Sequence, residues 1–267
     1  MDLTFIIPTR IETEDRLRNI ISSVSYLLKH LDAKVIVKEV SPENTFKFRA
    51  LPEIKKYADI SNLTHLYEES QAPLFCKSKV LNDLIVAADT KLVANYDADC
   101  ILPLTSYHRA YDFLERGDAD VVYPYGCGIY QWKAAYDMNI YNQFVHTLST
   151  DVLDKHKTLS NSTIGWTQFI NRKKYIECYM MNENFISWGC EDDEFYFRMS
   201  TLGNRIARVD DYVYHLEHSR TDNSWFSNPN FNNNWQLWHK IKTFDRNQLI
   251  QYYKGQEYLK TRRKLLR

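Results

Sequence analysis

The chain has 267 residues, a length that fits one large domain or one domain with an appendage. Its 34 lysine and arginine residues equal its 34 aspartate and glutamate residues, and 44% of the chain is hydrophobic. These values argue against a disordered chain and against a nucleic-acid-binding protein held by bulk positive charge. Aromatic residues reach 14%, which suits sugar or base binding but is also ordinary core material.

The first hundred residues alternate between predicted strands and helices. The expected strands cover residues 3–7, 34–40, 63–67 and 92–96, and the expected helices cover residues 17–31 and 77–88. This alternation predicts an α/β fold with a mostly parallel sheet and helices on both faces. Ligands bind at the carboxyl ends of such strands, which directs attention to residues 8–10, 39–41 and 97–99.

The second half is less regular. We expect strands at residues 120–125 and 164–170, a helix at 191–202, and one or two strands within 206–214. Residues 228–234 are rich in asparagine and predict a loop, and a helical segment is expected from Trp235 to the end.

Charge is distributed unevenly along the chain. Residues 240–267 hold nine basic and two acidic side chains, a net charge of +7, so residues 1–239 carry −7. This tail is either a solvated helix that closes the domain or a surface that docks on an anionic membrane, where each basic residue contributes about 1 kcal/mol.

Targeting signals are not apparent in the sequence. No apolar run approaches the roughly 18 residues needed to span a bilayer, and the first residues lack the basic start of a signal peptide. Five cysteines without close paired spacing fit reduced thiols better than a disulfide framework. We therefore expect a cytoplasmic protein, with peripheral contact at the inner face of a membrane left open.

An acidic pair directly follows the strand expected at residues 92–96. Asp97 and Asp99 are placed to hold a divalent cation, which would neutralise a diphosphate. The alternative is a solvated acidic turn, because a bare Asp-x-Asp is common.

Four consecutive acids, residues 191–194, open the helix expected at 191–202. They are either a charged cap that complements the helix dipole or the source of a general base acting on a hydroxyl. Trp188 precedes them and suits stacking on a sugar ring, and Gly189 would let a ligand approach the backbone.

Two further clusters attract attention. His215 and His218 follow a predicted strand and are plausible ligands for Mn²⁺ or Zn²⁺, although a lone histidine is more often structural. Residues 75–82 place Lys77 and Lys79 at a helix start that would attract an anion, or they are simply the basic first turn of an amphipathic helix.

Taken together, the motifs resemble the GT-A glycosyltransferases, and within them the β-1,4-galactosyltransferase family and the bacterial chondroitin-polymerase-like enzymes. The resemblance covers about residues 3–220 and rests on five motifs in the family's order. These are Pro8-Thr9-Arg10, the helix start from Phe75 to Asn82, Asp97-Ala98-Asp99, Trp188 to Asp193, and His215 to Arg220.

The resemblance implies a role for each of these residues. Asp192 would be the catalytic base, and Asp99, His215 and His218 would bind Mn²⁺ or another divalent cation. The nucleotide would contact Pro8, Arg10, Phe75, Lys77, Asp97 and Ala98, with Glu39 added by its position after a strand. The acceptor would contact Trp188, Gly189, Glu191 and Asp193, and residues 162–165 would lie near the donor sugar. The chain departs from the family at Glu12, Lys77 and Cys190, where a basic residue, arginine and glycine are usual.

The expected function is that of an inverting hexosyltransferase. It would move galactose, N-acetylgalactosamine or a similar sugar from a UDP-sugar to a glycan hydroxyl, with a lipid-linked acceptor left open and a role in polysaccharide biosynthesis. Residues 1–225 would form the catalytic domain, with a nucleotide-binding half at 1–100 and an acceptor-binding half at 101–225, and residues 226–267 would form a loop and basic helical tail. A metal-dependent nucleotidyltransferase and a non-catalytic carbohydrate-binding protein are the alternatives.

Overall fold

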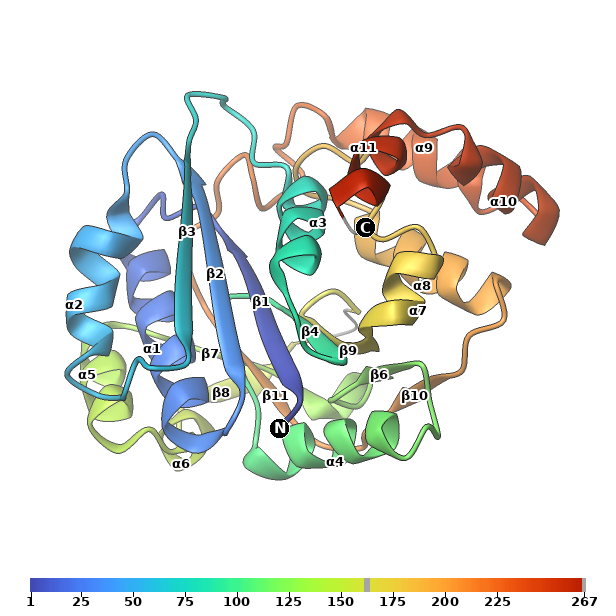
Figure 1. The fold of residues 1–267 in the computed structure, drawn as a ribbon. Helices are drawn as coiled ribbons and strands as arrows, with labels where there is room; N and C mark the ends of the chain where they lie inside the picture. The colour runs from blue at the N-terminus through green and yellow to red at the C-terminus, as the bar shows by residue number, and fades with distance from the viewer. Residues whose placement is uncertain (161–163, 266–267) are drawn as a thin grey trace.

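A seven-stranded sheet forms the centre of the computed structural model, which describes residues 1–160 and 164–265 (Figure 1). The strand order is β10-β6-β9-β4-β1-β2-β3. All neighbours run parallel except β9, which is antiparallel to both β4 and β6. The strands are β1 Leu3–Thr9, β2 Lys34–Ser41, β3 Leu63–Glu69, β4 Leu92–Tyr96, β6 Val121–Tyr123, β9 Thr167–Asn171 and β10 Ile206–Arg208. The mostly parallel sheet predicted from the sequence is confirmed.

Helices cover both faces of this sheet. Helix α1 packs with α2 on one side of strands β1 to β3, and α3 packs against β1 from the other side (Figure 1). Most of the predicted apolar positions of α1 are buried and Leu28 is half-buried, because they recur at the spacing of one helix face. The helices before the C-terminal segment are α1 Glu14–His30, α2 Leu51–Ile54, α3 Lys77–Ala87, α4 Leu104–Glu115, α5 Met138–Thr147, α6 Thr150–Asp154, α7 Arg172–Glu177 and α8 Glu191–Thr201, with single turns η1 Phe46–Ala50 and η2 Gly128–Tyr130.

A smaller second sheet was not predicted. Its order is β5-β11-β7-β8, formed by β5 Cys100–Ile101, β11 Val213–Leu216, β7 Gln131–Ala134 and β8 Lys157–Leu159. Strand β11 pairs antiparallel with β5, so that His215 lies opposite Cys100. The sequence had suggested that His215 follows a strand, whereas the structure places it within β11. This pairing brings the end of the Asp97–Asp99 segment beside residues more than a hundred positions away.

The C-terminal segment is three helices, α9 Phe231–Ile241, α10 Arg246–Lys254 and α11 Glu257–Leu265. The loop predicted at residues 228–234 is wrong at its second half, because α9 begins at Phe231. Asparagine is a weak helix former, but the side chain of Asn234 accepts from the backbone N–H of Ile186 and donates to its carbonyl. These tertiary bonds outweigh the local preference.

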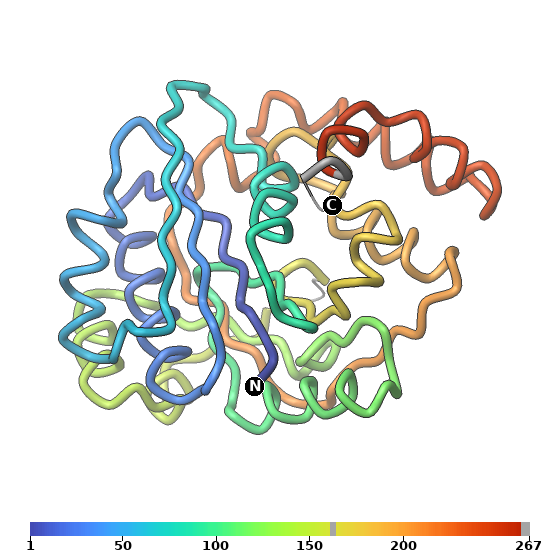
Figure 2. Tube along the Cα trace, in the orientation of Figure 1, coloured from blue at the N-terminus to red at the C-terminus, as the bar shows by residue number. Residues whose placement is uncertain are grey.

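Helix α11 folds back onto α3, as the ribbon and the tube trace show (Figures 1 and 2). Arg262 pairs with Asp83 of α3 and lies 2.9 Å from the carboxylate of Glu183. At least this basic residue of the C-terminal segment is used in packing against the domain and is not part of an exposed basic surface. Among the helices that the structure describes, none is long and apolar enough to cross a membrane.

Candidate active site

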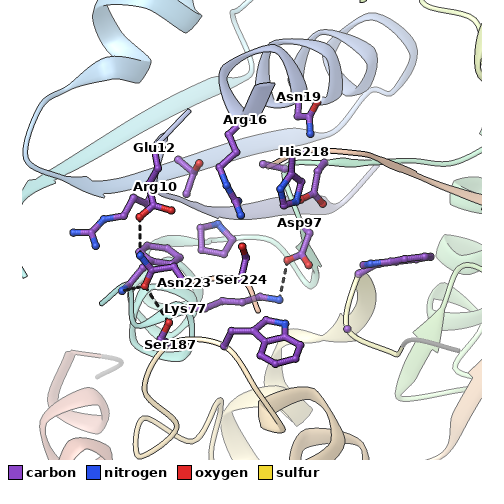
Figure 3. Close-up of a pocket in the computed structure, with 18 of the residues that line it drawn as sticks. Arg10, Glu12, Arg16, Asn19, Lys77, Asp97, Ser187, His218, Asn223 and Ser224 are labelled. Atoms are coloured by element: carbon purple, nitrogen blue, oxygen red, sulfur yellow. Dashed lines mark hydrogen bonds and ion pairs between the residues drawn. The ribbon is translucent and has the colours of Figure 1, made fainter. Parts of the chain in front are cut away.

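A cavity opens at the carboxyl ends of β1 and β4 and is bounded by α1, α3, β11 and the start of α8 (Figure 3). It brings together most of the side chains that the sequence had placed in a site. The predicted residues that line it are Pro8, Arg10, Phe75, Lys77, Asp97, Ala98, Asp99, Trp188, Glu191, Asp192, His215 and His218. Residues from five separated segments of the chain therefore share one cavity.

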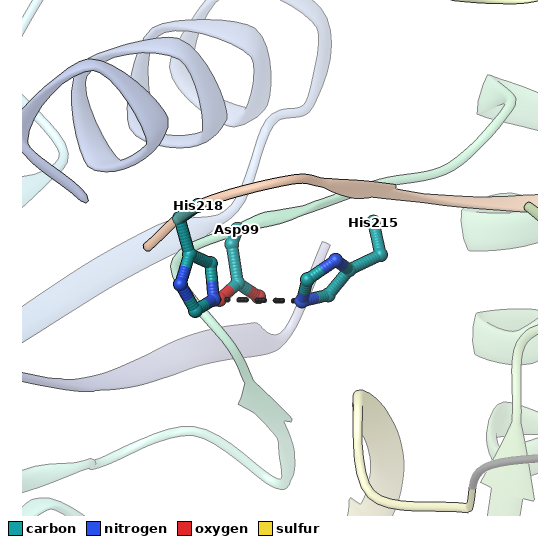
Figure 4. Close-up of side chains that lie close together, drawn as sticks. All are labelled: Asp99, His215 and His218. Atoms are coloured by element: carbon teal, nitrogen blue, oxygen red, sulfur yellow. Dashed lines mark ion pairs between the residues drawn. The ribbon is translucent and has the colours of Figure 1, made fainter. Parts of the chain in front are cut away.

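Three of these side chains form a group suited to a metal ion. One ligand atom each from Asp99, His215 and His218 lies within 4.8 Å of the other two (Figure 4). The Nε2 atoms of His218 and His215 lie 3.0 and 3.7 Å from Oδ2 of Asp99. Two imidazoles and a carboxylate are a donor set that suits Mn²⁺ or Zn²⁺.

Outer hydrogen bonds fix both imidazoles in a ligating orientation. Nδ1 of His218 lies 2.9 Å from the carbonyl oxygen of Ser219, and Nδ1 of His215 lies 3.2 Å from the carboxylate of Glu217. Each Nδ1 can therefore donate a proton outward, which leaves Nε2 free to ligate. Trp166 stacks on His215 with ring centroids 5.4 Å apart and limits its movement.

Lys77 lies between two carboxylates of the cavity, those of Asp97 and Asp192. Its Nζ is 2.8 Å from Oδ1 of Asp97 (Figure 3) and 3.8 Å from Oδ2 of Asp192. Burial disfavours the charge on Lys77, but Asp192 and Asp97 outweigh burial and hold its pKa well above the ordinary value. Lys77 therefore remains a cation within a strongly acidic site.

The carboxylates of the cavity have pKa values that diverge. Burial, opposed by Lys77, raises the pKa of Asp97 to about 6 and raises the pKa of Asp192 well above its usual range. Burial acts in the same direction on Asp99, but His215 and His218 overcome it and hold the pKa of Asp99 below its usual range. Asp99 is therefore the carboxylate held most firmly in the ionised, ligating form.

Asp192 is covered by a glycine of the segment before β9. A Cβ atom added to Gly165 would lie 2.0 Å from Oδ2 of Asp192. Any larger residue at position 165 would therefore displace this carboxylate. Ser162 and Thr163, which were expected near the donor sugar, lie outside the described residues.

Arg10 borders the cavity, but its guanidinium is used for structure. Nε donates to the carbonyl of Val40, and the two terminal nitrogens donate to the carbonyls of Pro73 and Ala72. Arg10 thus fixes the chain that leads to Phe75 with three of its five N–H donors, and it also lines the cavity.

Three predicted residues do not line the cavity. Glu39 is fully buried and accepts a hydrogen bond from the backbone N–H of Phe46, so the structure gives it a role under η1 instead of a contact with uracil. Asp193 points to the exposed side of α8. Gly189 has φ +123°, and a Cβ there would lie 2.9 Å from the ring of Phe231, so this glycine admits an aromatic ring of the chain itself and not a ligand.

Trp188 lines the cavity, but its ring is packed in a cluster of aromatic side chains. It stacks against Phe231 and Trp225, with centroids 5.6 and 6.2 Å apart, and meets Phe226 edge-on. The sequence had predicted a free stacking face at Trp188, whereas the two rings of this cluster with large exposed surface are Trp225 and Phe226.

Sequence reasoning missed several polar residues of the cavity, including Arg16, Asn19 and Asn223. Arg16 extends from α1 into the cavity, and its buried Nε has no hydrogen-bond partner among the described residues (Figure 3). Its charge also lowers the pKa of Asp99. The only signal in the sequence was its place in the first turns of the helix after β1.

Known structures share this arrangement of elements. A structure of TarS residues 1–349 from S. aureus with UDP-GlcNAc is 15% identical, with a TM-score of 0.58, and the match covers 100% of this chain and 70% of that one. The catalytic domain of Drosophila β1,4-galactosyltransferase 7, in complex with xylobiose, is 13% identical with a TM-score of 0.52, over 90% of this chain and 79% of that one.

The chain has the GT-A glycosyltransferase fold. A mannosyltransferase from Pyrobaculum calidifontis, in complex with GDP-Man and Mn²⁺, is 15% identical with a TM-score of 0.51. That match covers 81% of this chain, which spans 56% of the mannosyltransferase. A family model described as the N-terminal domain of galactosyltransferase matches residues 150–219, a segment that contains Asp192, His215 and His218. No curated protein sequence matches the chain.

Proposed function

We propose that this protein is an inverting, metal-dependent glycosyltransferase that moves a hexose from a UDP-sugar to a hydroxyl of a glycan. Galactose and N-acetylgalactosamine are the favoured sugars, on the resemblance to galactosyltransferases in the motif series. One observation carries the proposal, namely that a single cavity is lined by a three-residue metal group, by Lys77 and by the carboxylate of Asp192, which lies 3.8 Å from the Lys77 ammonium group.

The residues present fit a divalent cation. Asp99, His215 and His218 would hold it, because their ligand atoms converge and the outward Nδ1 atoms of both histidines are hydrogen-bonded. The cation would supply positive charge beside the diphosphate of the donor as that group leaves.

Two basic side chains of this chain complement that charge. Lys77 is held near Asp97, and Arg16 has a buried donor without a partner among the described residues. We assign both to the diphosphate, because charged hydrogen bonds to phosphate oxygens are strong and an unpaired buried donor is costly. Arg16 would supply the second positive charge that the family usually carries where this chain has Glu12.

Asp192 is the proposed general base. In the transfer, the acceptor oxygen forms a bond to the anomeric carbon and the bond from that carbon to the diphosphate breaks. The electron pair leaves with UDP, and the hydroxyl proton passes to the carboxylate of Asp192. A single displacement from the face opposite the leaving group inverts the anomeric configuration.

Glu191 helps to fix the turn that precedes Asp192. Its carboxylate accepts a hydrogen bond of 2.8 Å from the N–H of Gly189, which closes the turn before α8. The raised pKa of Asp192 suits proton acceptance near neutral pH better than an ordinary aspartate would.

Replacement of Asp192 by asparagine tests the assignment. Removal of a general base reduces transfer by about 10²- to 10⁴-fold, and we expect that loss in kcat with little change in UDP affinity. Asp112→Asn, at an exposed position on α4, is the matched control. Full transfer activity in Asp192→Asn would refute Asp192 as the base.

A further inference from the structure

An exposed aromatic surface adjoins the cavity. Trp225 and Phe226 are 45% and 61% exposed, respectively, which is unusual for two consecutive large apolar residues. They pack on each other with centroids 5.2 Å apart, and both contact Trp188, which lines the cavity. The surface therefore continues from the wall that carries Asp192.

The loop that presents these rings is fixed to several walls of the cavity. The side chain of Asn223 accepts hydrogen bonds from the backbone N–H of Phe75 and from the hydroxyl of Ser187, and donates to the carboxylate of Glu12 (Figure 3). Asn228 donates to the carbonyl of Trp188 at 2.7 Å. Trp225 and Phe226 are thus held in place by polar anchors, which is the condition for a preformed binding surface.

We propose that Trp225 and Phe226 form a second acceptor subsite, which binds a pyranose ring of the acceptor glycan next to the ring that is attacked. This inference rests on the proposed transferase function. The C–H face of a pyranose packs on aromatic rings, and hydroxyls at its rim need polar partners. Arg220 supplies one, because its guanidinium lies 5.1 Å from the ring centroid of Trp225 and its side chain also lines the cavity.

The charge of the surrounding segment favours a glycan over a membrane. Residues 219–239 contain one basic and one acidic side chain, Arg220 and Asp222, apart from His239. A surface that docks on an anionic bilayer carries lysine and arginine around its aromatic residues. The exposed neighbours here include Asn232 and Asn233, whose amides suit hydroxyl groups.

The inference predicts that acceptor length is recognised through Trp225. With Mn²⁺ and UDP present, binding of chitobiose, N-acetyllactosamine and lactose is compared with binding of N-acetylglucosamine and galactose by saturation-transfer NMR. At least one disaccharide should bind about tenfold more tightly than its monosaccharide, as one stacked ring provides. Trp225→Ala and Phe226→Ala should each remove most of this advantage, and Trp225→Tyr should retain part of it.

Trp235→Ala is the matched control, because Trp235 is 47% exposed on α9 and stacks on His239 outside the cavity. UDP affinity and the unfolding midpoint are measured for every variant. The inference fails if no disaccharide binds better than its monosaccharide, if Trp225→Ala and Trp235→Ala behave alike, or if Trp225→Ala abolishes binding to vesicles of anionic phospholipid while disaccharide binding persists. Failure of the proposed function itself differs, since the wild-type protein would then bind no UDP.

Discussion

The ammonium group of Lys77 lies 3.8 Å from the carboxylate of Asp192 and links the donor side of the cavity to the proposed base. The same nitrogen lies 2.8 Å from Asp97. A cation between two carboxylates lowers the pKa of each, and here it opposes the burial that raises them. The charge on Lys77 therefore sets the pH range in which Asp192 is ionised.

This relationship predicts the pH profile of Lys77→Met. A general base acts in its ionised form, so transfer rises with pH through the pKa of Asp192, which burial holds above its ordinary value. Removal of the Lys77 charge raises that pKa further, and the acid limb of kcat/KM should move to higher pH. Lys77→Arg keeps the charge and should keep the wild-type limb. If the acid limb of kcat/KM stays at the same pH in Lys77→Met, the charge of Lys77 does not control the pKa of Asp192, whatever the maximum value of kcat/KM.

Loss of a single ligand should weaken metal binding strongly. His215→Ala and His218→Ala each remove one of the three donors, and we expect Mn²⁺ affinity, measured by electron paramagnetic resonance, to fall by more than the roughly 10- to 100-fold that loss of an outer partner costs. Glu217→Ala removes the outer partner of His215 and should cause a smaller loss. His108→Ala, at an exposed site on α4, is the control. Wild-type affinity in both histidine variants would show that the ion binds elsewhere.

Gly165 should be intolerant of even one methyl group. In Gly165→Ala the added Cβ would meet Oδ2 of Asp192 at 2.0 Å, so the carboxylate must move. A displaced catalytic group costs about 10²-fold, and we expect this loss in kcat with a nearly unchanged unfolding midpoint. In Gly255→Ala the nearest atom lies at 3.5 Å and φ is not positive, so this variant should behave as wild type. Equal activity of the two variants would argue against a fixed position for Asp192.

Arg262 should stabilise the attachment of α11 to α3. Arg262→Ala leaves the half-buried carboxylates of Asp83 and Glu183 without this partner, and we expect a loss of about 1–3 kcal/mol in the free energy of unfolding. Lys260→Ala removes an exposed i,i+3 pair and should cost less than about 0.5 kcal/mol.

The effect of Arg262 should also depend on pH. Burial raises the pKa of Asp83, but Lys38 and Arg262 outweigh burial and hold this pKa below its ordinary value. The ionised Asp83 therefore contributes fully to the free energy of unfolding above the ordinary value, and this contribution is lost as the pH falls through the lower pKa of the folded state. The difference between Arg262→Ala and wild type, measured by urea unfolding, should therefore shrink from pH 7 to pH 3. A difference that is constant or grows would mean that the ion pair is not its source.

The sequence predicted the strands that position the donor side of the site, because β1, β2 and β4 each have a short apolar run with turn residues beyond it. It did not predict β5, β7 and β8, because β5 has only two residues and the short segments Gln131–Ala134 and Lys157–Leu159 have neither an apolar run nor a clear alternation. The approach of Asp99 to His215 depends on these short strands. It could therefore be predicted from the resemblance to a known family, but not from the predicted helices and strands.

Individual roles were harder to predict than the place of the site. Glu39 was expected after a strand, but it lies within β2 and its carboxylate accepts from the backbone of η1, and nothing in residues 46–50 indicated a helical turn. Gly189 was read as a point of ligand approach, whereas the ring that approaches it comes from Phe231, more than forty residues later. Such contacts arise from tertiary packing and leave no local signal.

The decisive experiment for the proposed activity measures release of the nucleoside diphosphate, UDP or GDP, from a panel of UDP- and GDP-sugars with and without Mn²⁺. We expect a UDP-hexose to be hydrolysed, EDTA to abolish the reaction and Mn²⁺ to restore it, and His218→Ala to require far more Mn²⁺ than wild type. Hydrolysis that is indifferent to EDTA, or a failure to turn over any UDP-sugar in the panel while another class of nucleotide is consumed, would contradict it.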